Sequence, residues 1–345
     1  MVLVSVVGDF YSSILPIYYE FHKEITTHLI VHDDFRSDAV FTQKIVNGTL
    51  AFNRENSLNI KTFIIKMDED SFSAAKSVIG MIEKHLDGYE NLTINITDGL
   101  ANIGVMLSDA FKPKGAKILT YDRYDNEYNI LKEQSMKTYK MRTSLSIKSH
   151  LQLKNIEILE TQDMSFAQKY KKEIALFFEY YSADKVAYKE ARGVSRAFEK
   201  MPVGFLYEYY IYNLIKDLDY DDILMGVKVC DRVSQEIYSE NEFDILIMKE
   251  NHLHMIECKY RDELDITALV YKLDSIRTTL DEDANILIVS NYEAYMPTVN
   301  DTKRSLPASL KRGLANKIHF RGSPVENREQ FIADVDDIFK LSAKR

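Results

Sequence analysis

The sequence has little of what marks secreted or membrane-spanning proteins. Its 345 residues include two cysteines, Cys230 and Cys258, too few for a disulfide framework and typical of a reducing cytoplasm. No stretch approaches the ~18 consecutive apolar residues of a membrane span. The apolar segment 1–7 lacks a basic flank and runs directly into Gly8, so it favours a buried strand over a signal peptide. We therefore expect a cytoplasmic protein that does not associate with membranes.

Two further absences narrow the class of protein. No GxGxxG follows the first apolar segment, which excludes a dinucleotide redox site there. The net charge of −9 argues against a general nucleic-acid coat protein, which is normally basic. A nuclease remains compatible with it, because metal ions and local basic patches can neutralise phosphates. One basic stretch, 302–322, has no acidic residue and is either a solvated face or a contact for a nucleic-acid backbone. Its cations are Lys303, Arg304, Lys311, Arg312, Lys317 and Arg321.

The first third of the chain alternates between strand-like and helix-like patterns. Strands are predicted over 1–7, 26–33, 60–67, 92–97 and 116–121, and helices over about 11–22, 36–52, 71–87 and 100–111. Such alternation predicts an α/β fold with a mostly parallel, doubly wound sheet. Chain length and an apolar fraction of 46% indicate about two globular domains.

Two turns after predicted strands have a composition that suits phosphate binding. Ligands of doubly wound sheets bind beyond the C-terminal ends of strands, where helix N-terminal amides and hydroxyl groups are available. The alternative is an ordinary pair of strand-to-helix turns with Ser, Thr and Asp as caps. The candidate ligand-binding residues are Gly8, Asp9, Phe10, Tyr11, Ser12 and Ser13 in the first turn, and Thr97, Asp98, Gly99 and Asn102 in the second.

A predicted strand pair in the second half contains a carboxylate–lysine pattern. Side chains alternate along a strand, so Glu257 and Lys259 share one face and Cys258 lies on the other. A hairpin would bring Asp244 alongside them. Two carboxylates can hold a hard divalent cation, and a nearby ammonium can act on the attacking water. The alternative is the solvated face of an edge strand.

The neighbouring sequence favours the metal-site interpretation. Residues 245–248 are apolar on both faces, as in an interior strand, where charges need a metal or one another to offset desolvation. Upstream, a helix predicted over 204–218 has Glu208 on the flank of its apolar stripe. Glu208 is either a solvated side chain or a third metal ligand. His252 and His254 fall on the face opposite Glu257, which argues against a zinc site.

Taken together, Gly204-x-x-x-Glu208, 241–244 and Glu257-Cys258-Lys259 resemble the PD-(D/E)XK nuclease superfamily. In that family a helix carrying Glu, a strand carrying Asp and a strand carrying Glu-x-Lys are followed by a helix and a strand, here 264–280 and 284–291. The resemblance implies a restriction-endonuclease-like α/β/α domain that hydrolyses phosphodiesters with Mn²⁺ or Mg²⁺. It implies that Glu208, Asp244 and Glu257 bind the metal and that Lys259 positions the water or stabilises the transition state.

The N-terminal part resembles the Rossmann-like CARF domain of CRISPR-associated ancillary nucleases. Gly8 to Pro16 is similar to that family's first ligand loop, and 95–99 to its Asn-x-Thr-Gly-Gly turn. The resemblance implies a homodimer that binds a cyclic oligoadenylate and then cuts DNA, RNA or both in type III CRISPR antiviral defence. Cyclic tetraadenylate is the ring we expect. The implied domains are a CARF domain at 1–125, a connector at 126–165 and a nuclease domain at 166–345.

The second turn departs from the family pattern. Asp98 replaces the first glycine, and Ala101 stands where the family often has a lysine. Another cation, such as Arg36, Lys44 or a group from the second subunit, is needed in its place, and the ring size stays open. Two alternatives also stay open: an ungated restriction- or repair-type endonuclease, and a nucleotide-sensing regulator with a vestigial nuclease fold.

Overall fold

The structure, a computed structural model, describes residues 1–8, 13–33, 39–67, 72–99, 101–133, 135–183, 196–233, 236–261, 264–281, 283–291 and 308–340. The chain forms two compact units. The first comprises Met1–Glu157 and Cys230–Glu240, and the second comprises Ile158–Val229 and Asn241–Ser342. The domain boundaries expected near residues 126 and 166 stay a prediction.

A mixed seven-stranded sheet forms the first unit, in the order β3-β2-β1-β4-β5-β6-β7. The five predicted strands are present and parallel, and two antiparallel strands extend the sheet beyond them. The parallel strands are β1 (Val2–Val6), β2 (Thr27–Asp33), β3 (Lys61–Met67), β4 (Leu92–Asn95) and β5 (Lys117–Asp122), and the antiparallel ones are β6 (Glu127–Lys132) and β7 (Ser135–Lys140).

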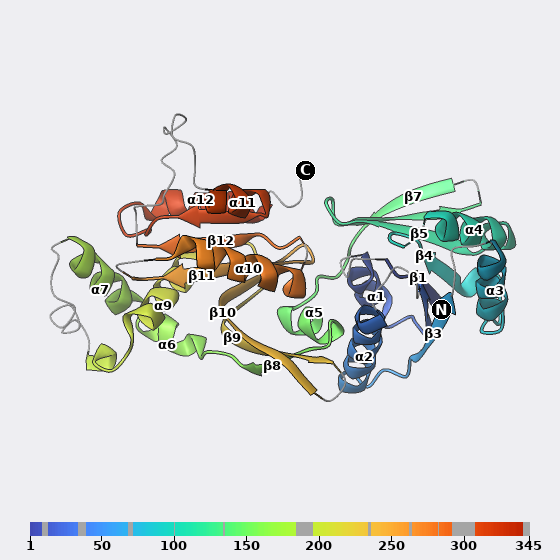
Figure 1. The fold of residues 1–345 in the computed structure, drawn as a ribbon, viewed down its shortest axis with the longest axis horizontal. Coiled ribbons are helices and arrows are strands. Elements are labelled where there is room, and N and C mark those ends of the chain that lie inside the picture. Colours follow the sequence, from blue (N-terminus) through green and yellow to red (C-terminus); the bar gives the residue numbers. More distant parts are fainter. Residues whose placement is uncertain are drawn as a thin grey trace. The chain divides into compact units, whose positions relative to one another are not determined.

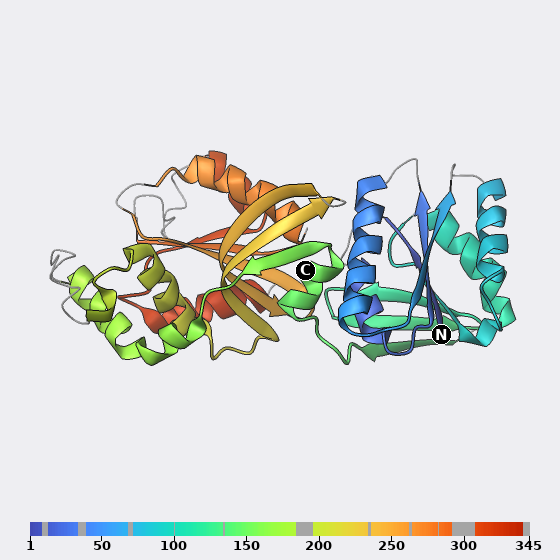
Figure 2. The same cartoon turned by 90° about the horizontal axis from the view of Figure 1, so that it is seen from below.

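The predicted helices of the first unit cover both faces of this sheet. Helices α1 (Leu15–Phe21) and α2 (Ala39–Glu55) lie on one face, and α3 (Phe72–Glu83) and α4 (Ala101–Phe111) lie on the other (Figures 1 and 2). The chain first runs from β1 through β2 to β3 on one side of β1, and then continues with β4 and β5 on the other side. Right-handed crossovers in these two directions place the connecting helices on opposite faces of the sheet. The strand order therefore reverses between β1 and β4, and both predicted ligand turns follow these two strands.

The second unit contains a six-stranded sheet in the order β13-β12-β11-β10-β9-β8. The predicted strand pair is present: β10 and β11 are antiparallel, with Lys249 opposite His252. Their two-residue loop, Glu250 and Asn251, has φ values of 50° and 66°, as a type I′ hairpin turn requires. The strands are β8 (Ile156–Glu160), β9 (Asp222–Val233), β10 (Glu236–Lys249), β11 (His252–Lys259), β12 (Ile286–Ser290) and β13 (Ile318–Arg321).

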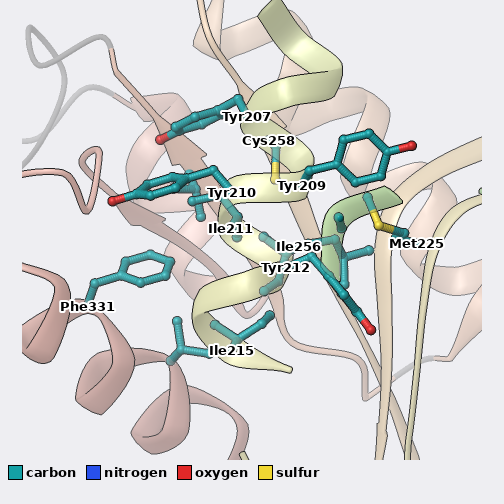
Figure 3. Packing of buried hydrophobic residues seen from close by; sticks show 14 of the residues in the cluster. Tyr207, Tyr209, Tyr210, Ile211, Tyr212, Ile215, Met225, Ile256, Cys258 and Phe331 are labelled. Carbon is teal, nitrogen blue, oxygen red and sulfur yellow. The ribbon is translucent and has the colours of Figure 1, made fainter. Parts of the chain in front are cut away.

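Helix α9 (Val203–Ile215) organises the core of the second unit. It packs against β11 and against α6 (Met164–Lys169), α7 (Lys171–Ala183) and α12 (Arg328–Lys340). Tyr207 and Tyr210 point to one side of α9 and Tyr209 to the other (Figure 3). A helix that is enclosed on several sides needs apolar residues on more than one face, which explains its aromatic sequence. The remaining helices are α5 (Ile147–Leu153), α10 (Ile266–Leu280) and α11 (Ala308–Ala315).

Two structural findings concern the cysteines and the apolar character of the helices. Cys230 and Cys258 are buried and neither forms a disulfide. Among the helices of the described ranges, none is long and apolar enough to cross a membrane.

Two helix glycines predict opposite effects of the same substitution. A Cβ on Gly48 of α2 would lie 2.1 Å from the carbonyl oxygen of Leu153 in α5. We expect Gly48→Ala to destabilise the fold by about 1–3 kcal/mol through this clash. Nothing lies within 4 Å of a Cβ on Gly80 of α3, so Gly80→Ala should stabilise by up to ~1 kcal/mol through helix propensity. Denaturant unfolding measures both, and equal effects would contradict the close α2–α5 packing.

A buried histidine predicts part of the acid sensitivity. Burial lowers the pKa of His28 on β2 to about 3, with Ser5 Oγ 2.9 Å from its Nε2. The unfolded chain binds this proton below about pH 6.5, whereas the folded chain stays neutral there, so stability falls with falling pH by up to ~1.4 kcal/mol per unit. The free energy of unfolding of His28→Gln should fall less steeply between pH 6 and 4. Equal slopes for variant and parent would show that His28 does not contribute.

Candidate functional site

The hairpin of β10 and β11 brings the predicted carboxylates and lysine together. Asp244 Oδ2 accepts a hydrogen bond from the Cys258 amide at 2.7 Å. Lys259 Nζ lies 2.7 Å from Glu257 Oε1 and 3.5 Å from Asp244 Oδ2. Both strands lie inside the six-stranded sheet, between β9 and β12. The cluster is therefore not the polar face of an edge strand.

Burial makes this cluster electrostatically costly. The side chains of Asp244, Glu257 and Lys259 are 15%, 4% and 19% exposed. Burial, together with the Glu257 carboxylate, raises the pKa of Asp244. Burial alone would lower the pKa of Lys259, but Asp244 and Glu257 outweigh it and raise that pKa. One ammonium thus balances two carboxylates in an environment of low polarity.

Glu208 of α9 belongs to the same cluster. Burial, followed by the charge of Asp244, raises the pKa of Glu208. Its Oε2 accepts a hydrogen bond of 3.3 Å from Gln162 Nε2. With all three carboxylates ionised and Lys259 protonated, the four groups sum to a charge of −2. Surplus buried negative charge of this kind is what a divalent cation would offset.

The chemistry of these donors fits a hard divalent cation, which prefers carboxylate oxygens. Across the described ranges, however, no group of three or more His, Cys, Asp or Glu side chains is close enough to hold a metal. The contacts explain why: Lys259 pairs with Glu257, and Asp244 is held by the Cys258 amide. Asp244 and Glu257 contact Lys259, and Glu208 lies close enough to Asp244 for their charges to interact. Metal coordination would require the three carboxylates to converge further.

In the first unit, the two predicted ligand turns lie against each other. A Cβ on Gly8 would be 2.1 Å from Asp98 Oδ1, so the glycine makes room for that carboxylate. Ser13 Oγ donates to Asp98 Oδ2 at 3.3 Å, and Asn95 Nδ2 donates to the Ser13 carbonyl at 2.9 Å. Asn102, the second residue of α4, accepts a hydrogen bond from the Ile103 amide through its Oδ1 at 3.0 Å. Four predicted residues, Asp9, Phe10, Tyr11 and Ser12, lie outside the described residues.

A cavity of about 490 Å³ opens beside these turns, a volume typical of small-ligand sites. Ser13, Thr97 and Asp98 line it, as the sequence predicts. The sequence did not predict the other lining residues, which lie at the end of β5, directly after it or on β6. The sequence did contain a signal for them, because β5 is the next parallel strand and must end at the same edge of the sheet. In the structure, Thr97 Oγ1 accepts a hydrogen bond from the Tyr121 amide of β5 at 2.7 Å. The missed lining residues are Thr120, Tyr121, Asp122, Arg123, Tyr124 and Asn129.

Neither Arg36 nor Lys44, the residues expected to replace a lysine at Ala101, lines this cavity in the part of the chain that the structure describes. Among the described lining residues, Arg123 is the one with a positive charge. Its guanidinium lies 5.0 Å from the centre of the Tyr124 ring and donates to the Tyr124 hydroxyl at 3.1 Å. Lys44 instead pairs with Asp231 at 2.6 Å, and Arg36 lies outside the described residues.

Three cations of the basic stretch, among those that the structure describes, form ion pairs with acidic side chains. Arg312 pairs with Asp274 at 3.1 Å, Lys317 with Asp283 at 2.9 Å and Arg321 with Asp334 at 2.6 Å. Lys303 and Arg304 are not among the described residues. The absence of acidic residues within the stretch concealed these partners, which come from other elements, so the pattern gives little support for a nucleic-acid contact.

These features define a two-unit α/β protein with a ligand-sized cavity in one unit and a buried carboxylate–lysine cluster in the other. Residues 198–296 match the family model described as the Card1-like endonuclease domain. The matched span contains Glu208, Asp244, Glu257 and Lys259, which supports a nuclease assignment for the second unit. No curated protein matches the chain.

Solved structures share the fold over nearly the whole chain. Protein VC1899 from Vibrio cholerae superposes with a TM-score of 0.71 at 16% identity, covering 100% of this chain and 99% of that one. Can2 from Sulfobacillus thermosulfidooxidans, in complex with cyclic tetra-adenylate, gives 0.69 at 14% identity, covering 96% and 98%. A type III CRISPR defence DNA nuclease activated by cyclic oligoadenylate gives 0.56 at 13% identity, covering 91% and 51%. These likenesses confirm the predicted fold class.

Proposed function

We propose that the chain is a metal-dependent nuclease of type III CRISPR antiviral defence, activated by a cyclic oligoadenylate. The observation that carries the proposal is the buried cluster of Asp244, Glu257 and Lys259, inside the segment that matches a Card1-like endonuclease domain. The fold adds support, because similar structures are described as bound to cyclic tetra-adenylate or activated by cyclic oligoadenylate.

The residues of the second unit have separate proposed roles in metal binding and in catalysis. Bound Mn²⁺ or Mg²⁺ would supply Lewis-acid activation of the phosphodiester and of water. Glu208, Asp244 and Glu257 are its proposed ligands. The Cys258 amide orients Asp244, as groups behind a ligand commonly do. The Lys259 ammonium orients the attacking water or stabilises charge that develops on the phosphoryl oxygens.

The first unit supplies the proposed sensor. The cavity beside Ser13, Thr97 and Asp98 would take part of the activator, with Arg123 facing its phosphates. We propose a homodimer in which paired first units share one ring, preferably cyclic tetraadenylate. The substrate is DNA, RNA or both.

Removing either the proposed ligand Glu257 or the lysine should abolish cleavage. We expect Glu257→Gln and Lys259→Ala each to reduce the rate by about 10²-fold or more, because the cation or the transition-state charge loses its partner. Plasmid, single-stranded DNA and RNA are incubated with Mn²⁺, with and without cyclic tetra- or hexaadenylate. Glu250→Gln in the hairpin turn, at the other end of β11, is the matched control and should keep full activity.

The same assay separates the alternatives. Full activity in Glu257→Gln would contradict the assignment of the catalytic centre. Cleavage that ignores every added cyclic nucleotide would indicate an ungated endonuclease. Ligand binding without any metal-dependent cleavage would indicate a sensor whose nuclease fold is vestigial.

Charge changes in the cavity should alter ligand affinity in opposite directions. Arg123→Gln should raise the Kd of cyclic tetraadenylate about tenfold, because it removes a charge-assisted contact to phosphate. Asp98→Asn should lower that Kd several-fold, because it removes repulsion and still offers Ser13 an acceptor. Calorimetric titration measures both, with exposed Lys140→Gln as the control. A tighter Arg123→Gln complex would contradict phosphate binding at this cavity.

A further inference from the structure

Gln162, which the sequence reasoning did not single out, reaches into the carboxylate cluster. It lies in the link between β8 and α6. Its backbone N–H donates a hydrogen bond to the backbone carbonyl of Met225 in β9 at 3.0 Å. Its side-chain Nε2 donates to Glu208 Oε2 at 3.3 Å. Its Oε1 is buried and has no hydrogen-bond partner among the described residues. A buried amide oxygen without a partner is costly, which calls for a ligand that completes it.

The opposing strand is shaped to admit this side chain. Gly226 of β9 has φ 55°, and a Cβ there would lie 2.1 Å from Gln162 Cγ and 2.4 Å from Cδ. Glycine weakens a strand interior, and its presence often marks a close approach. Any larger residue at 226 would displace Gln162 from Glu208. The backbone tie to Met225 and the space over Gly226 therefore fix one orientation for the amide.

From these contacts we infer that Gln162 both positions Glu208 and offers a further oxygen ligand to the proposed metal site. It holds Glu208 beside Asp244, and its Oε1 completes the oxygen environment of the divalent cation. Hard cations accept amide oxygens as well as carboxylates. A neutral oxygen also adds a donor without increasing the surplus negative charge of Glu208, Asp244 and Glu257. This inference rests on the proposed function, because it presumes a metal at that cluster.

Calorimetric titration of the full chain with Mn²⁺ tests the inference directly. Gln162→Leu should raise the Kd for Mn²⁺ about 10- to 100-fold, as loss of groups around a metal site typically does. Cleavage should recover to within a few-fold of the parent rate at saturating Mn²⁺, since the reacting groups remain. Gly226→Ala should raise the Kd in the same direction by displacing Gln162.

A matched glycine controls for backbone strain. Gly115 also has positive φ, 97°, but nothing lies within 4 Å of a Cβ there, so Gly115→Ala should leave the Kd unchanged. Parent-like Mn²⁺ affinity in Gln162→Leu, or an equal loss in Gly115→Ala and Gly226→Ala, would overturn the inference and leave the proposed function standing. Failure of the parent protein to bind Mn²⁺ would overturn both.

Discussion

The contact between the Lys259 ammonium and two buried carboxylates is the constraint on which the second unit depends. The Glu257 side chain is almost fully buried, and Lys259 Nζ lies 2.7 Å from its Oε1, so removing one partner would leave the other without its ion pair. The pair is possible because β11 lies between two other strands and under α9, which exclude water from one face. Glu208 then adds a further carboxylate that Lys259 cannot fully balance. The surplus of buried negative charge in this cluster destabilises the fold and favours the binding of a cation.

In the first unit, the parallel sheet brings turns that are distant in sequence to one place. Parallel pairing of β1 with β4 and of β4 with β5 makes three strands end at one edge of the sheet. The carboxylate of Asp98 occupies space left by Gly8, and Thr97 ties the second turn to β5. The cavity follows from this convergence. Asp98, Asp122 and Arg123 give its lining charges of both signs.

Local patterns in the sequence were sufficient for much of this architecture. Strand and helix periodicity predicted β1–β5 and α1–α4, and alternation along β11 placed Glu257 and Lys259 on one face. The expectation of a hairpin was enough to associate Asp244 with them, and the two-residue turn in the structure sets the register. Gln162 was missed because it matters through its contact with Glu208 of α9. Arg123 was missed because it matters through a cavity that it lines together with the turn after β4. Gly226, a glycine within an apolar strand, was the local sign of such a contact.

The proposed function requires Glu208, Asp244 and Glu257 to converge on a divalent cation, with the Lys259 ammonium moved away from Glu257. Crystals of the protein soaked in Mn²⁺ and measured at the manganese absorption edge test this most directly. We expect an anomalous peak among these three carboxylates, with Lys259 displaced from Glu257. Retention of the 2.7 Å contact between Lys259 and Glu257 without a peak there, at Mn²⁺ concentrations that support cleavage, would contradict it.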